Sequence, residues 1–362
     1  MFRQKTTIVV GAGASCEIGL PSGEGLKTQI TDLLSATDDN AYGLRNDRLI
    51  RAVKARLGHG DTTYIGGTPN MAEIAEIKAA AARIRRGLSL ALSIDNFLHT
   101  HQDDREVVRL GKTTIAMAIL EAESRSALFG DRTPMDAHRM AHAGRVRFPS
   151  MGSQGLNQSW YPAFAQLLMT QVQKAEAAAA FTNLRFVIFN YDRCLEQFLW
   201  MAAQDYFDLS EQEAADLLAP VEFIHPYGSL GPLPWQDAAA TAVPLGNADG
   251  LDLWQIGARI RTFTESVASE LEPRIKSAME DAATIMLLGF GYLDQNVRLL
   301  RPGEKRNAQR VMSTAFGISE EDREIVQECM ASFARPNYPQ IMIEPGSCRS
   351  FFDRFRLQLS LR

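Results

Sequence analysis

Cysteine is scarce in this chain, and the few cysteines present are far apart in the sequence. The four are Cys16, Cys194, Cys329 and Cys348, so no paired Cys-x-x-Cys segment exists among the 362 residues. Structural zinc sites and the disulfide scaffolds of small secreted proteins both depend on closely spaced cysteines. The sequence therefore excludes a four-cysteine zinc module and predicts free thiols in a reducing, cytoplasmic compartment.

Long apolar runs and a large excess of one charge are also missing. No apolar stretch approaches the roughly 18–20 residues of a membrane span. Met1 to Lys5 lead into an apolar strand rather than into the pattern of a signal peptide. The formal net charge is -5, and 46% of the residues are hydrophobic. We therefore expect a globular cytoplasmic protein with no membrane segment and no direct nucleic-acid binding.

An apolar, β-branched run that falls into a glycine turn is present near the start. A strand predicted at residues 6–11 is followed by Gly13 and Ser15, and Leu20-Pro21-Ser22-Gly23 is typical of the entry to a helix. Glycines let the backbone approach a ligand closely, and a helix N-terminus favours an anion. The full Gly-x-Gly-x-x-Gly fingerprint is absent, because Cys16 takes the place of the third glycine. The segment predicts either a pyrophosphate site or a tight turn that serves packing alone.

Two later strands, predicted at 184–190 and 221–225, end on polar side chains. Asn190 and Asp192 follow the first strand, and His225 ends the second. Because the carboxyl ends of parallel strands meet at one edge of a sheet, we expect Asn190 and His225 in the crevice beside the glycine turn. Two alternatives stay open. Asn190 is also a good N-cap for the helix that follows, and His225 is also a structural histidine at a strand end.

The order of these motifs resembles the sirtuin-like family of NAD-consuming proteins, and within it the bacterial branch that acts in defence against phage. The resemblance spans residues 8 to about 296 and implies an α/β, Rossmann-like parallel sheet with helices on both faces. The segments that carry it are, in order, Gly11–Ser15, Ser93–Leu98, Asn190–Asp192, His225–Ser229 and Thr284–Tyr292.

The resemblance also implies roles for single residues, with NAD as substrate. Asn190 orients the ribose and a water molecule, and His225 is the general base. Asp192 either contacts a ribose hydroxyl or holds the turn after its strand. The residues expected around NAD, from its phosphates to its adenosine, are Gly11, Ala12, Gly13, Ser15, Asp192, Gly289 and Phe290.

Two departures from the protein-deacylating sirtuins shape the functional prediction. Pro226 and Tyr227 separate the histidine from the glycine that follows it directly in those enzymes, and the zinc-binding cysteines are missing. We therefore predict an NAD glycohydrolase that needs no metal and depletes NAD in anti-phage defence. The alternatives are a zinc-free NAD-dependent deacylase or ADP-ribosyl transferase, and a non-catalytic subunit that senses NAD or ADP-ribose.

Strand–helix alternation stops between the first two strands, where helices are predicted at 71–101, 103–129 and 159–180. The sequence thus predicts a Rossmann-like domain over 1–36 and 181–362 with a mainly helical insertion over 37–180. The remaining elements are predicted at 22–36, 192–204, 251–280, 284–289, 317–334 and 339–343.

Two further patterns in the insertion favour ordinary surface roles. His138 and His142 have metal-ligand spacing but no nearby third ligand, so we expect surface histidines. Arginines between Arg83 and Arg147 make the insertion basic, which is typical of a solvated face.

We also expect a homo-oligomer built partly on 37–180 and a separately encoded partner. The resemblance suggests a ring-forming DNA-translocase-type ATPase, or else an Argonaute-like protein.

Overall fold

A parallel sheet organises the fold in the computed structural model, which describes residues 2–58, 71–129, 154–237, 241–247, 249–267, 270–337 and 339–361. The strand order is β3-β2-β1-β4-β5-β6, with every neighbouring pair parallel. The bounds are β1 (Thr6–Val10), β2 (Leu184–Ile188), β3 (Glu222–Ile224), β4 (Thr284–Leu288), β5 (Arg310–Thr314) and β6 (Gln340–Glu344). This is the order of a doubly wound sheet, so the predicted Rossmann-like α/β fold is confirmed.

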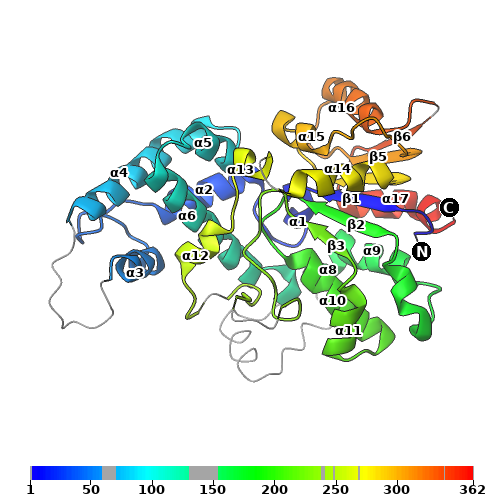
Figure 1. The fold of residues 1–362 in the computed structure, drawn as a ribbon, viewed down its shortest axis with the longest axis horizontal. Helices are drawn as coiled ribbons and strands as arrows, with labels where there is room; N and C mark the ends of the chain where they lie inside the picture. Colours follow the sequence, from blue (N-terminus) through cyan, green and yellow to red (C-terminus); the bar gives the residue numbers. More distant parts are fainter. Residues whose placement is uncertain are drawn as a thin grey trace.

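Helices cover both faces of the sheet (Figure 1). Within β1, Val9 packs into one core while Ile8 and Val10 pack into the other, because successive side chains of a strand point to opposite faces. On the first face lie α14 (Leu271–Asp281), α15 (Asp294–Leu300) and α16 (Glu320–Phe333). On the second lie α9 (Trp160–Met169), η3 (Lys174–Ala180), α10 (Cys194–Phe207), α11 (Glu211–Leu218) and α17 (Cys348–Leu361).

A layer of helices beside the sheet is centred on α6 (Arg105–Ser124), which contacts α2, α4, α5 and α12. Between Leu110 and Leu120 every α6 residue is buried, because these helices surround it. The bounds in this layer are α2 (Gly23–Leu33), α3 (Asp47–Arg56), α4 (Met71–Gly87), η1 (Leu88–Leu90), α5 (Ile94–Thr100), α12 (Leu253–Ala258) and α13 (Phe263–Val267). The remaining short helices are α1 (Ala12–Cys16), η2 (Ala127–Phe129) and α8 (Gln154–Gln158).

A buried ion pair ties the helical layer to the sheet. Arg193, in the loop after β2, lies 2.6 Å from the Glu123 carboxylate of α6, and the two side chains are 1% and 0% exposed. Arg193 also donates to the carbonyl groups of Val243 and Pro244. The pair therefore joins α6, the strand end of β2 and the loop that follows β3.

Several predicted helices are shorter than the sequence suggests. The range 71–101 divides into α4 and α5, because Ala91 is extended and Gly87, against which Phe97 packs, ends α4. The range 159–180 divides near Gln171, whose φ of 70° no α-helix accepts. The range 251–280 holds α12, α13 and α14 rather than one helix. Strand β5 was not predicted.

The division into 1–36 with 181–362 and an insertion at 37–180 stays a prediction. Helices α2 and α12, which that division places with the sheet, contact α6 of the helical layer. Helix α9, which it places in the insertion, packs against α10 and α17 beneath the sheet. Within the described ranges, none of the helices combines the length and apolarity needed to cross a bilayer.

Candidate functional site

A pocket of about 680 Å³ lies at the carboxyl ends of β1, β2 and β4. The connection after β1 leads to β2 on one side, and the connection after β4 leads to β5 on the other. The pocket thus lies at the switch point where doubly wound sheets bind ligands. Its volume is within the ~300–1,000 Å³ typical of small-molecule sites. Its walls come from the turns after these strands, from α2 and α5, and from the segments that follow β5 and β6.

The glycines after β1 allow two backbone segments to touch. The Gly13 N–H donates to the Gly289 carbonyl oxygen at 3.0 Å. A Cβ on Gly11 would lie 2.8 Å from the Phe290 Cα, and Gly289 itself has a φ of +58°. Gly11, Ala12, Gly13, Gly289 and Phe290 all line the pocket. The two interpretations of the turn are therefore not exclusive, because the same glycines pack β1 against β4 and form the pocket wall.

Asn190 is held by the first turn. Its Nδ2 donates to Ser15 Oγ at 2.7 Å and to the Gly11 carbonyl oxygen at 3.1 Å. Helix α10 begins at Cys194 with Arg193 as its N-cap, so the helix-cap interpretation of Asn190 is wrong. Asn190 lines the pocket, and no other residue in the described ranges donates to its Oδ1. The amide oxygen is therefore free to bind a ligand or a water molecule.

Asp192 completes the same network. Ser15 Oγ donates to Asp192 Oδ2 at 2.9 Å, and the Cys194 N–H donates to Oδ1 at 3.1 Å. Burial, assisted by the Glu123 carboxylate, raises the pKa of Asp192 to about 6. Asp192 therefore holds the turn after β2, which was one of its two predicted roles. Ser15, expected near the phosphates, uses its hydroxyl to connect Asn190 with Asp192.

His225 lies behind Asn190. It is not among the described residues that line the pocket. Its Nδ1 is 3.0 Å from the Asn190 carbonyl oxygen, and its Nε2 is 2.7 Å from Glu196 Oε1. Burial opposes the charged ring, but Glu196 outweighs it, so the pKa of His225 is raised. His225 therefore packs behind the pocket wall formed by Asn190, and its predicted catalytic role stays a prediction. Both ring nitrogens are engaged, which is the geometry of the structural-histidine alternative.

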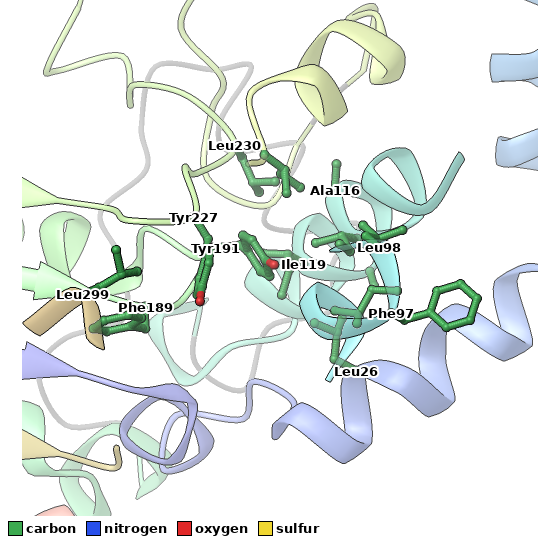
Figure 2. Close-up of a cluster of buried hydrophobic side chains, with 14 of the residues drawn as sticks. Leu26, Phe97, Leu98, Ala116, Ile119, Phe189, Tyr191, Tyr227, Leu230 and Leu299 are labelled. Atoms are coloured by element: carbon green, nitrogen blue, oxygen red, sulfur yellow. The ribbon is translucent and has the colours of Figure 1, made fainter. Parts of the chain in front are cut away.

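The polar side chains of the pocket that were not predicted as site residues include Asp95, Tyr191, Tyr227 and Asn296. The Tyr191 hydroxyl donates to Asp95 Oδ1, and the Tyr227 hydroxyl donates to Asn296 Oδ1 at 2.6 Å. Figure 2 shows Tyr191 between Tyr227 and the side chains of Ile119 and Leu98. Asp95 lies in the segment Ser93–Leu98 that carries part of the resemblance, but no local pattern indicates its contact with Tyr191.

Metal ligands do not gather in the described parts of the chain. Within those ranges, no group of three or more His, Cys, Asp or Glu side chains is arranged to hold a metal ion. His138 and His142, the pair with metal-ligand spacing, lie outside the described residues, as does Arg147. Among the described insertion arginines, Arg83 pairs with Asp104.

Comparison with known proteins does not assign a family. No family model matches the chain, and a search of curated proteins finds no match.

Proposed function

We propose that this chain is an NAD glycohydrolase that releases nicotinamide and ADP-ribose. The observation that carries the proposal is the convergence of the β1, β2 and β4 ends on one pocket that holds the Asn190 amide at its wall. Loss of nicotinamide passes through an oxocarbenium-like transition state, so the site must hold the ribose and a water. The free Oδ1 of Asn190 supports that role, because it can accept a hydrogen bond from either.

The surroundings of the pocket support a dinucleotide with its pyrophosphate near the first turn. Residues at or beside the N-terminal ends of α1, α2 and α17, namely Ala12, Gly23 and Cys348, line the pocket. Helix N-termini favour anions because their N–H groups and dipoles point outward. Phe290 lies at the pocket wall 5.3 Å from the ring of Phe189, which supplies an apolar surface for the rest of the ligand.

His225 has a supporting part in this proposal. Its Nδ1 contacts the carbonyl oxygen of Asn190, and Glu196 holds the opposite side of the ring. The ring thus fixes the backbone from which the Asn190 amide projects. We therefore assign His225 to positioning, in place of the general-base role that the family resemblance implied.

Asn190→Ala provides the first test. We expect the variant to keep its fold and to release nicotinamide from NAD ~10²-fold more slowly or worse, because positioning of ribose and water is lost. The measurement is nicotinamide release by chromatography. Asn157→Ala, which changes an exposed asparagine at the end of α8, is the matched control and should match wild type. Equal turnover in both variants would remove Asn190 from the site.

The same assay separates the alternatives. Nicotinamide release without any acceptor supports the hydrolase. Release that needs an acetylated peptide or another acceptor protein indicates a deacylase or a transferase. NAD binding without turnover indicates a sensing subunit. The defence role and the separately encoded ATPase or Argonaute-like partner belong to the same proposal and rest on the family resemblance.

A further inference from the structure

Hydrolysis in this pocket needs a group that accepts the proton of the attacking water. His225 is unavailable, since both of its ring nitrogens have partners. Asp192 is also engaged, because Ser15 and Cys194 each donate to one of its carboxylate oxygens. Asp95 differs from both. Tyr191 occupies its Oδ1 and its own backbone N–H also contacts the carboxylate, but among the described residues no other side chain donates to its Oδ2.

We propose that Asp95 is the catalytic base of the pocket, accepting the proton of the water that attacks the nicotinamide ribose. The inference rests on the proposed NAD hydrolysis. It assigns to a residue of α5, in the helical layer, a step that the family resemblance placed on His225.

The step balances without a further reactant. The water oxygen forms a bond to C1′ of the ribose while the bond from C1′ to the nicotinamide nitrogen breaks. The electron pair of that bond returns to the pyridinium ring, which leaves as neutral nicotinamide. The water proton passes to the Asp95 carboxylate and then to solvent. NAD and water thus give ADP-ribose, nicotinamide and a proton.

The surroundings of Asp95 suit a base. It lies in the first turn of α5, where its neighbours Ile94 and Phe97 are buried in the apolar core. Burial raises the pKa of Asp95 to about 6, although the hydrogen bond from Tyr191 acts in the opposite direction. Tyr227 also faces Asp95, and its own pKa is raised by burial and by that carboxylate. A base whose pKa lies near the working pH accepts protons efficiently.

Charged groups on the helices packed against α5 have partners of their own. On α2, Lys27 Nζ donates to the Ala91 carbonyl oxygen at 2.8 Å and lies 2.7 Å from Glu24. On α6, Lys112 lies 2.7 Å from Glu265 of α13. In the described ranges no cation pairs with Asp95, so its ionisation depends chiefly on burial and on Tyr191.

Asp95→Asn removes the basic group and keeps its size. We expect kcat for NAD cleavage at pH 7.5 to fall ~10²–10⁴-fold, the usual contribution of acid–base catalysis. NAD binding, followed by calorimetry, should change little. The matched control is Asn96→Ala, which alters the next residue of α5 on the side that faces a separate hollow beside Arg86. It should leave both kcat and binding unchanged.

The pH dependence of kcat distinguishes a base from a structural carboxylate. In wild type, kcat should fall below pH about 6, where Asp95 becomes protonated. Tyr191→Phe removes a hydrogen bond that stabilises the charged form, so the falling limb should move to higher pH. In Asp95→Asn this limb should be absent.

The outcomes separate this inference from the proposed function. If wild type cleaves NAD but Asp95→Asn keeps its kcat, or if Tyr191→Phe leaves the limb in place, the assignment of Asp95 is overturned and the hydrolase stands. If wild type releases no nicotinamide, the proposed function fails and this inference fails with it.

Discussion

A chain of hydrogen bonds holds the Asn190 side chain in place from the buried residue Glu196 outward. Glu196 is 2% exposed, and one of its oxygens meets His225 Nε2 at 2.7 Å. His225 in turn contacts the backbone of Asn190, whose side chain is held by Ser15 and Gly11. A change at the buried end of this chain of contacts should therefore reach the pocket.

Glu196→Gln tests that dependence through pH. The pKa of His225 is raised in the folded protein. The His225–Glu196 pair therefore stabilises the fold fully at pH values below the ordinary histidine pKa. This stabilisation is lost as pH rises through the pKa of His225 in the folded protein. We expect the variant to lower the free energy of unfolding by roughly 3 kcal/mol at pH 6, and by less at pH 9. Urea denaturation at both pH values measures it. Glu211→Gln, on an exposed carboxylate, is the control, and an equal loss at both pH values would contradict the assignment.

Elements differ in how far the sequence specifies them. Strands β1, β2 and β4 are predictable, because each is an apolar run that stops at a glycine or a polar group. Strand β5 is not, since Arg310–Thr314 holds only Val311 and Met312 as apolar residues and depends on pairing with β4 and β6.

Some residues of the candidate site are predictable from the sequence and others are not. The ends of the strands bring Asn190, Asp192 and the glycines together, as the parallel topology requires. The approach of Asp95 to Tyr191 depends on how the helical layer packs, and no short-range signal encodes that packing. The contact between His225 and Glu196 also depends on tertiary packing. The helical period of α10 does not show which of its sides faces His225.

The contact between the β1 and β4 turns gives an element-scale prediction. Gly289→Ala places a Cβ against the backbone of Gly13 in addition to straining a φ of +58°. Gly317→Ala is a matched control, since Gly317 has a φ of +76° but a Cβ added there would meet no atom within 4 Å. We expect the control to cost about 1 kcal/mol from backbone strain alone, and Gly289→Ala to lower the melting temperature much further. Similar melting temperatures would show that the close approach is unimportant.

At the scale of the whole molecule, two exposed apolar residues provide a test of the predicted homo-oligomer. Leu90, the last residue of η1, and Leu92, in the connection to α5, are 89% and 77% exposed. They lie in the range 37–180, on which the predicted homo-oligomer is partly built. Two large apolar side chains exposed within three residues of one another are candidates for a protein–protein contact.

Leu90→Asp tests this assembly. We expect light scattering to report a smaller particle for the variant than for wild type, because a charge in an apolar contact is costly to desolvate. Leu357→Asp, on α17, is the control, since Leu357 is 71% exposed outside that range. A pull-down from the native host tests for the separately encoded partner. A wild-type monomer with no co-purifying protein would refute both the predicted homo-oligomer and the predicted partner.

The Asp95–Tyr191 hydrogen bond has one more consequence. It joins a helix of the helical layer to the loop that follows β2. If Asp95 is the base of the proposed hydrolysis, the catalytic groups are divided between the helical layer and the sheet, and hydrolysis depends on the contact between the two. A small shift at that contact would then silence the protein without unfolding it or emptying the pocket. Such an arrangement would let a displacement of the outer helices switch the proposed hydrolysis on or off.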